Sequence, residues 1–222
     1  MGAFDSRAAE YDSWYDEHQP VFLSEVRAIR EALPRGAQGM EIGTGTGRFA
    51  AALGIKTGVE PAAAMAELAR KRGIEVYDGK AEALPFEDDS FGFALMATTL
   101  CFVKRPVAAL KEARRAIRPG GRLVLAIVDK DSPAGKEYWR RRARRPFYKG
   151  AKAYGAAKII GWLKTLGFAG IEARQTLFLQ PEEARGLEPV KPGHGEGLFV
   201  VISGTKDKRR FAGAKEKSRR KK

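Results

Sequence analysis

The chain has 222 residues and a single cysteine, Cys101, so it can form no internal disulfide and must rely on its own core for stability. No apolar run approaches the ~20 residues of a membrane span, and the first six residues lack the basic and then apolar order of a secretion signal. One cysteine also offers no metal cluster. We therefore expect a soluble, cytoplasmic protein with neither a membrane nor a metal as partner.

The formal charge of +14 is concentrated in two stretches. Residues 206–222 carry ten Lys or Arg against two acidic residues, and residues 136–152 carry eight against one. The remainder is close to neutral, so a polyanion-binding face over the whole chain is not indicated. The tail at 206–222 also lacks apolar periodicity and is predicted to be disordered.

The N-terminal part is predicted to be a helical cap over residues 1–34. Apolar and aromatic residues recur at helical spacing over 5–17. A second helix follows Pro20 and ends before Pro34, because proline and the glycine after it stop helices.

Strands and helices then alternate with short connections, which predicts a parallel, doubly wound sheet. The fourth of these strands is nearly all apolar, as expected when both faces are buried. The predicted strands cover 40–42, 55–60, 74–77, 91–98 and 122–128, and the predicted helices cover 48–54, 62–71 and 105–117.

The pattern changes after residue 133. A basic and aromatic stretch is followed by one more helix and by two strands that enclose a loop rich in Pro, Gly and Glu. These segments cover 136–149, 154–166, 171–179, 197–204 and, for the loop, 180–196.

A glycine-rich loop, Glu41-Ile42-Gly43-Thr44-Gly45-Thr46-Gly47, follows a strand and opens a helix, the context in which such a loop binds a ligand. A dinucleotide fingerprint would need Gly or Ala at the position of Arg48, so a ligand without a pyrophosphate is favoured. Glu60 ends the next strand, where a carboxylate can accept charge-assisted hydrogen bonds from both ribose hydroxyls. The two features together predict a site for a nucleoside.

These residues and three further segments resemble the class I S-adenosylmethionine-dependent methyltransferases, in particular the ubiquinone/menaquinone-methyltransferase-like (type 11) subgroup. The segments are 78–91, similar to the adenine-side loop and fourth strand, 115–123, similar to the turn into strand five, and 8–15, similar to the cap helix. The resemblance implies an α/β, Rossmann-like, doubly wound sheet of seven strands, mostly parallel with one antiparallel strand, and S-adenosyl-L-methionine as cofactor. It implies one methyltransferase domain over residues 1–205, followed by the tail at 206–222. Within the domain, residues 1–34 would form the cap and residues 133–167 an acceptor-side helical region.

The resemblance also implies roles for individual residues. The glycine loop would line the methionine part of the cofactor, Glu41 would neutralise its ammonium directly or through water, and Glu60 would hold its ribose. The backbone of Ala81 would meet the adenine, whereas Lys80, which has no acceptor for the adenine amine, is expected to point outward. The predicted cofactor-binding residues are Tyr11, Glu41, Gly43, Thr44, Gly45, Glu60, Pro61, Ala81, Glu82 and Thr98.

The sequence identifies no certain catalytic residue, because orienting the two reactants can supply most of the catalysis of a methyl transfer. Two candidates are His194, which could act as a base in an overhanging loop, and Thr99, at the expected methyl-transfer mouth. Cys101 is expected to be a small buried residue. Four aromatic side chains of the basic stretch and beyond are expected to pack an acceptor-side cap, or alternatively to stack nucleobases: Trp139, Phe147, Tyr148 and Tyr154.

We therefore expect a methyltransferase whose small-molecule acceptor the sequence does not identify. One alternative is an RNA methyltransferase that uses the basic segments 136–152 and 206–222, with a steep salt dependence. A second is a cofactor-binding module without catalysis. The sequence does not indicate an oligomeric state.

Overall fold

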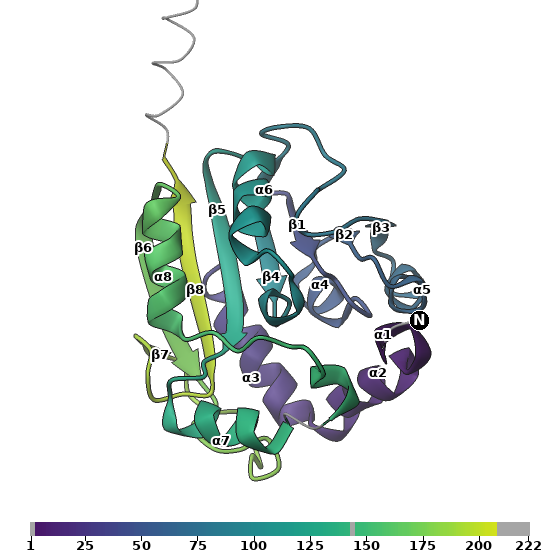
Figure 1. Cartoon of the computed structure of the whole chain (residues 1–222), viewed down its shortest axis with the longest axis vertical. Coiled ribbons are helices and arrows are strands. Elements are labelled where there is room, and N and C mark those ends of the chain that lie inside the picture. Colours follow the sequence, from purple (N-terminus) through teal and green to yellow (C-terminus); the bar gives the residue numbers. More distant parts are fainter. Residues whose placement is uncertain (1–2, 143–144, 208–222) are drawn as a thin grey trace, which may run out of the picture.

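The computed structural model describes residues 3–142 and 145–207, and within them an eight-stranded sheet runs through the molecule (Figure 1). Its order is β3-β2-β1-β4-β5-β8-β6-β7. The strands are β1 Gly39–Ile42, β2 Thr57–Val59, β3 Glu75–Tyr77, β4 Phe91–Ala97, β5 Ile117–Val128, β6 Phe168–Thr176, β7 Lys191–Pro192 and β8 Phe199–Lys206.

The first five strands pair in parallel with one another, and β8 lies antiparallel between β5 and β6. The Rossmann-like α/β fold with an inserted antiparallel strand is therefore confirmed. The predicted count of seven strands is wrong by one, because the two residues of β7, inside the predicted loop 180–196, pair with β6. Two residues carry no alternating pattern from which a strand could be predicted.

Helices cover both faces of the sheet because successive residues of a strand point to opposite sides. In β4, Phe93 and Leu95 pack with α3 (Gln19–Arg30), α4 (Arg48–Leu53) and α5 (Ala63–Lys71). Ala94 and Met96 pack on the other face with α6 (Pro106–Ala116) and α8 (Ala156–Thr165). This sandwich of helix, sheet and helix forms the hydrophobic core.

Short helices gather beyond the carboxyl ends of the parallel strands, in the lower part of Figure 1. They are α1 (Ala3–Ser6), α2 (Ala8–Glu17), the turn η1 (Leu100–Phe102), α7 (Pro133–Arg142) and the turn η2 (Pro146–Tyr148). The single helix predicted over 5–17 is therefore two, with a break at Arg7, whose φ of −134° is not helical.

Ion pairs fasten α2 to the body of the fold. The Arg48 guanidinium donates to Asp12 at 2.9 Å and to Asp16 at 2.6 Å, and Arg72 donates to Asp12 at 2.7 Å. Partial burial works against the charge on Asp12, yet hydrogen bonds from Arg48, Thr46 and Arg72 outweigh it and lower its pKa to about 2. The cap is thus held against the start of α4, directly after the glycine loop.

The predicted domain boundary at 205 falls inside β8, which continues to Lys206. The Lys206 ammonium is 1% exposed and donates to the Asp89 carboxylate and to the Ile117 carbonyl, both at 2.7 Å. We therefore place the end of the folded domain after this lysine. The rest of the predicted tail, 208–222, lies outside the described residues.

Candidate functional site

The site lies at the carboxyl ends of β1 and β4, where the order in which successive strands are added to the sheet changes sides. From β1 the chain adds β2 and β3 on one side, and then returns to add β4 and β5 on the other. Ligands of open α/β sheets bind at this point, outside the carboxyl ends of the strands. A cavity of about 600 Å³ opens here, and we call it the glycine-loop cavity.

The glycine loop forms one wall of this cavity. Gly43 has a φ of 69° and lies so close to Thr99 that a Cβ atom would collide with that side chain. Gly45 has a φ of 55°, and a Cβ atom there would meet nothing within 4 Å. The first glycine is therefore needed for packing, and the second leaves the backbone open to a ligand.

Glu60 is held at the floor of the cavity by the loop itself. Its carboxylate accepts hydrogen bonds from the backbone N–H of Gly45 at 2.9 Å and of Ala62 at 3.0 Å. Burial raises its pKa above the usual value for glutamate, although the two bonds oppose the shift. An ionised carboxylate has about four lone-pair sites, so about two remain for the vicinal hydroxyls of a ribose.

The side chains of Glu41 and Thr44 are buried on the inner side of the loop and do not line the cavity. Glu41 is 1% exposed and accepts a hydrogen bond from the Thr44 hydroxyl at 2.9 Å. Burial raises its pKa to about 8. The pair supports the loop from below, and a direct contact of either with the cofactor stays a prediction.

The other predicted cofactor-binding residues all come together at the glycine-loop cavity. Lys80, expected to point outward, also lines it. Glu82 accepts a hydrogen bond from the backbone N–H of Arg105 at 3.1 Å, which fixes its carboxylate at the rim. The predicted residues in the lining are Tyr11, Gly43, Gly45, Glu60, Pro61, Ala81, Glu82 and Thr98.

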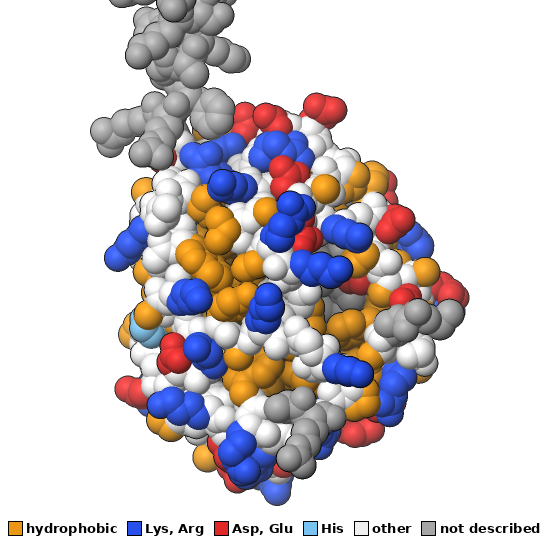
Figure 2. Space-filling model, viewed as in Figure 1, with side chains coloured by type: hydrophobic (Ala, Val, Ile, Leu, Met, Phe, Trp, Pro, Cys, Tyr) orange, Lys and Arg blue, Asp and Glu red, His pale blue; other side chains and the backbone are white. Residues whose placement is uncertain are grey.

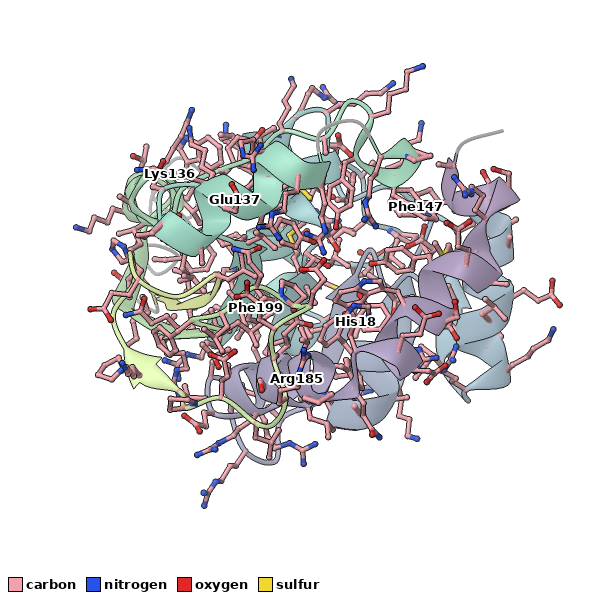
Figure 3. All side chains as sticks on the ribbon, turned by 90° about the horizontal axis from the view of Figure 1, so that it is seen from below. His18, Lys136, Glu137, Phe147, Arg185 and Phe199 are labelled. Atoms are coloured by element: carbon pink, nitrogen blue, oxygen red, sulfur yellow. The ribbon has the colours of Figure 1, made fainter. Side chains whose placement is uncertain are left out.

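A second cavity of about 420 Å³ lies between the cap and the region around α7, and we call it the aromatic cavity. Phe147, labelled in Figure 3, packs against Tyr11 with ring centroids 5.5 Å apart and borders both cavities. Thr98 and Phe102 border both as well. The rings that line only the aromatic cavity are Trp14, Tyr15, Tyr138, Trp139, Tyr148 and Tyr154.

Thr98 lies at the junction of the two cavities in a strained conformation. Its φ is 52°, in the left-handed region that β-branched residues rarely adopt. Its backbone N–H donates to the Ala126 carbonyl at 2.8 Å, which holds the turn after β4 against β5. Strain of this kind clusters at active sites and ligand clamps, which makes the junction a candidate part of the functional site.

Two charged side chains of the aromatic cavity escaped the sequence analysis. Glu25, on the buried face of α3, is 7% exposed, and burial raises its pKa to about 8. Arg142, at the end of α7, stacks on Tyr138 at 3.9 Å and pairs with Glu182 at 2.7 Å. A glutamate among the apolar positions of a predicted helix was the available signal for Glu25.

The candidate catalytic residues occupy different surroundings. His194 is exposed and lines neither cavity. Thr99 lines the glycine-loop cavity, but its hydroxyl donates to the Gly43 and Ala97 carbonyls at 3.1 and 3.0 Å, so it holds the loop. Cys101 donates to the Thr98 carbonyl, and burial raises its pKa to about 12, so its thiol stays neutral.

Within the described ranges, no three His, Cys, Asp or Glu side chains are grouped as they would be around a metal ion. The helices described here are also too short or too polar to cross a membrane.

Comparisons with known proteins agree with this geometry. A family model described as a methyltransferase domain matches residues 40–125. An uncharacterised protein of Methanocaldococcus jannaschii is 44% identical over 206 residues, which are 93% of this chain and 100% of that protein. A ubiquinone/menaquinone biosynthesis C-methyltransferase of Ruegeria sp. is 32% identical over 145 residues, or 56% of this chain and 57% of the enzyme.

The solved structures include a Thermotoga maritima protein described as an S-adenosylmethionine-dependent methyltransferase, possible histamine N-methyltransferase. It is 48% identical and superposes with a TM-score of 0.89 over 92% of this chain and 98% of its own. The chain is thus a member of the class I S-adenosylmethionine-dependent methyltransferases, of the type 11 group, and its cofactor is S-adenosylmethionine.

Proposed function

We propose that the chain methylates a small molecule held in the aromatic cavity, with the cofactor held in the glycine-loop cavity. The observation that carries this proposal is the shared wall of the two cavities at Tyr11, Thr98 and Phe147. A methyl donor on one side of the junction and an acceptor on the other would meet there. Holding both reactants in line is itself the main source of catalysis for such a displacement.

The residues of the glycine-loop cavity fit the cofactor. The open backbone at Gly45 admits the ligand, and the free lone pairs of Glu60 suit its ribose. When bound, the cofactor supplies a methyl group on a positively charged sulfur. The chain's own part is to orient the two partners and, through the rings of Tyr11 and Phe147, to keep water from the junction.

The size and walls of the aromatic cavity favour a small molecule over RNA. Its volume lies at the lower end of the range for small-molecule sites. The basic side chains of α7 are also engaged within the protein, since Arg140 and Arg141 both pair with Glu137 and Arg142 pairs with Glu182. Figure 2 shows Lys and Arg side chains scattered among hydrophobic ones on one face, without a continuous basic patch.

The relative from Thermotoga maritima is described as a possible histamine N-methyltransferase, and histamine is a small molecule. This description supports an acceptor of similar size.

A cytoplasmic location stays a prediction.

The test is a methyl-transfer assay with labelled cofactor over a panel of amines, phenols, quinones and RNA. We expect label in at least one small molecule and none in RNA. Label in RNA alone would contradict the proposal, and removing residues 208–222 would then flatten the salt dependence of binding. A chain that binds the cofactor but labels nothing would instead favour the non-catalytic module.

A further inference from the structure

Glu25 is a buried acid without a partner. Its side chain lines the aromatic cavity from α3, and among the described residues no hydrogen bond or ion pair reaches its carboxylate. Among the described residues the other buried acids accept hydrogen bonds, although one oxygen of the half-buried Glu188 has no partner. Asp129, which is 1% exposed, accepts from the backbone N–H groups of Asp131 and Ala156, both at 3.1 Å. Glu41 and Glu60 have the partners described above.

Burying a carboxyl group without a partner costs free energy, and most folds avoid it or neutralise the group. Glu25 is not needed to balance a neighbouring cation. The nearest buried cation in the same wall, Arg142, is paired with Glu182 and stacked on Tyr138, and it has no resolved effect on the pKa of Glu25. The acid is therefore free to receive a charge from a ligand.

Charged side chains also line the aromatic cavity: Arg7, which pairs with Glu10, and Glu17 and Arg145. The titratable groups that interact with Glu25 are tyrosines from three different elements. Tyr15 lies on α2, Tyr138 on α7 and Tyr148 on η2, and the charge on Glu25 raises the pKa of all three after the larger effect of their own burial. Their hydroxyls are already engaged, since Tyr15 bonds to Tyr11 and Tyr138 bonds to Tyr148. What they offer a ligand is the faces and edges of their rings.

One free carboxylate surrounded by aromatic rings is suited to an organic cation. Ring faces attract an ammonium group, and more strongly when water is excluded, and a carboxylate adds a charge-assisted hydrogen bond. We propose that the methyl acceptor is an organic amine that enters as a cation, with its ammonium group on Glu25 and its apolar part between the rings of Trp14, Tyr15 and Trp139. An ammonium nitrogen has no lone pair, so it accepts the methyl group only after the Glu25 carboxylate has taken one of its protons. That proton then passes to the solvent, and the product is again an ammonium ion. This inference rests on the proposed function and adds the class of its acceptor.

Proton balance gives the inference a distinct signature. In the empty cavity at pH 7 the Glu25 carboxyl is largely protonated, because its pKa is about 8. When the ammonium binds, the carboxyl gives its proton to the solvent and becomes the counter-ion. Each amine bound at pH 7 should therefore release about one proton, while a neutral ligand should release none.

The experiment uses the full chain loaded with S-adenosylhomocysteine, and calorimetry in two buffers of different ionisation enthalpy. The probes are tryptamine and 2-phenylethylamine, each paired with its neutral alcohol, tryptophol and 2-phenylethanol. We expect the amines to bind at least about tenfold more tightly than the alcohols, with proton release. Equal binding of amine and alcohol, binding of the alcohol alone, or no binding of either amine would overturn the inference without any variant.

Two variants complete the test. Glu25→Gln should remove both the preference for the amine and the proton release. Glu31→Gln, which removes the same charge directly after α3 at an exposed position, should retain both. If Glu25→Gln retains the preference, Glu25 is not the counter-ion.

The failure of the inference can be told from that of the proposed function. The affinity for S-adenosylhomocysteine, measured first, shows that each variant is folded and that the cofactor site is intact. If the parent chain does not bind S-adenosylhomocysteine, the proposed function is contradicted. If the chain binds S-adenosylhomocysteine but transfers methyl groups to neutral molecules only, the inference about the amine is contradicted and the proposed function stands.

Discussion

The glycine-loop cavity and the aromatic cavity share a wall but are built in different ways. Most of the first is made by turns that follow β1, β2, β3 and β4, so the sheet sets most of its shape, and the cap and the region around η2 complete it. The second is made mainly by α2 and α3 together with the region around α7, which follows them more than a hundred residues later in the chain. If the cavities hold the cofactor and the acceptor as proposed, the cofactor side is set by the sheet, whereas the acceptor side depends on segments that are distant in sequence.

The sharpest way to break this comparison is Gly45→Val. A branched side chain would point into the glycine-loop cavity from a backbone with a φ of 55°. We expect the affinity for S-adenosylmethionine to fall at least ~1000-fold, or ~4 kcal/mol, by calorimetry. The matched control is Gly36→Val, because Gly36 has a φ of 68° and open space around it but lies away from both cavities. The control should lose stability and keep its affinity; equal loss of binding in both would point to strain alone.

The pH dependence of the free energy of unfolding tests the surroundings of Glu25 in the aromatic cavity. An unfolded glutamate loses its proton near pH 4.5, whereas burial keeps that of Glu25 until about pH 8. The folded state therefore binds the extra proton, and the free energy of unfolding falls as the pH rises from about 4.5 to 8. Glu25→Gln should be more stable than the parent by ~2–4 kcal/mol at pH 8 and by little at pH 4.5.

Denaturant titrations at several pH values measure this difference. Part of the slope should persist in the variant, because Glu41 on the cofactor side has a raised pKa for the same reason. A parent chain whose stability does not change between pH 5 and 8 would mean that Glu25 has a partner in solution.

Glu60→Ala tests the cofactor side with a smaller expected effect. It removes an acceptor for the ribose and also the hydrogen bond that holds Gly45. We expect S-adenosylmethionine to bind ~1.5–3 kcal/mol more weakly. Glu67→Ala, an exposed glutamate of α5, serves as the control. Calorimetry that finds Glu60→Ala as tight as the parent would remove Glu60 from the ribose site.

The smallest effects are expected at the C-terminal end, because Lys206 and Asp207 line neither cavity. A chain shortened after Asp207 should bind the cofactor as before and melt within a few degrees of the parent. A chain shortened after Thr205 also loses the Lys206 ammonium that bonds to Asp89 and to the Ile117 carbonyl, which should cost ~1–3 kcal/mol of stability. Thermal melts compare the two. Loss of cofactor affinity on removing 208–222 alone would show that this segment belongs to the domain.

The same contrast explains what could be predicted from the sequence. The glycine loop and Glu60 lie within twenty residues of each other, and their spacing follows from one strand, one helix and the next strand. The parallel pairing of the first five strands was predictable because strands and helices alternate with short connections. The motif did not predict that Glu41 is buried with its carboxylate against the Thr44 hydroxyl, and its role toward the cofactor stays a prediction.

The acceptor side offered no comparable spacing. Glu25 reaches the cavity only because α3 packs beside the region around α7, and no rule of local sequence relates those segments. Lys206 was assigned to a basic tail because its neighbours in sequence are charged, although the register of β8 places its ammonium beside Asp89. The rings of Trp139 and Tyr148 were expected in the acceptor cap, but only the structure places them around an acid.

The position of β8 has a consequence for the order in which the molecule can be completed. β8 joins β5 to β6, and those two strands have no pairing of their own. During synthesis, β1 to β5 can pair as they leave the ribosome, whereas β6 has no place on the sheet until residue 206 has been made. Until then the β5 edge is open to other chains, a known hazard of unpaired strands. The buried ammonium of Lys206 closes this edge at its far end, so the half of the sheet that carries the acceptor cavity is completed after the half that holds the cofactor.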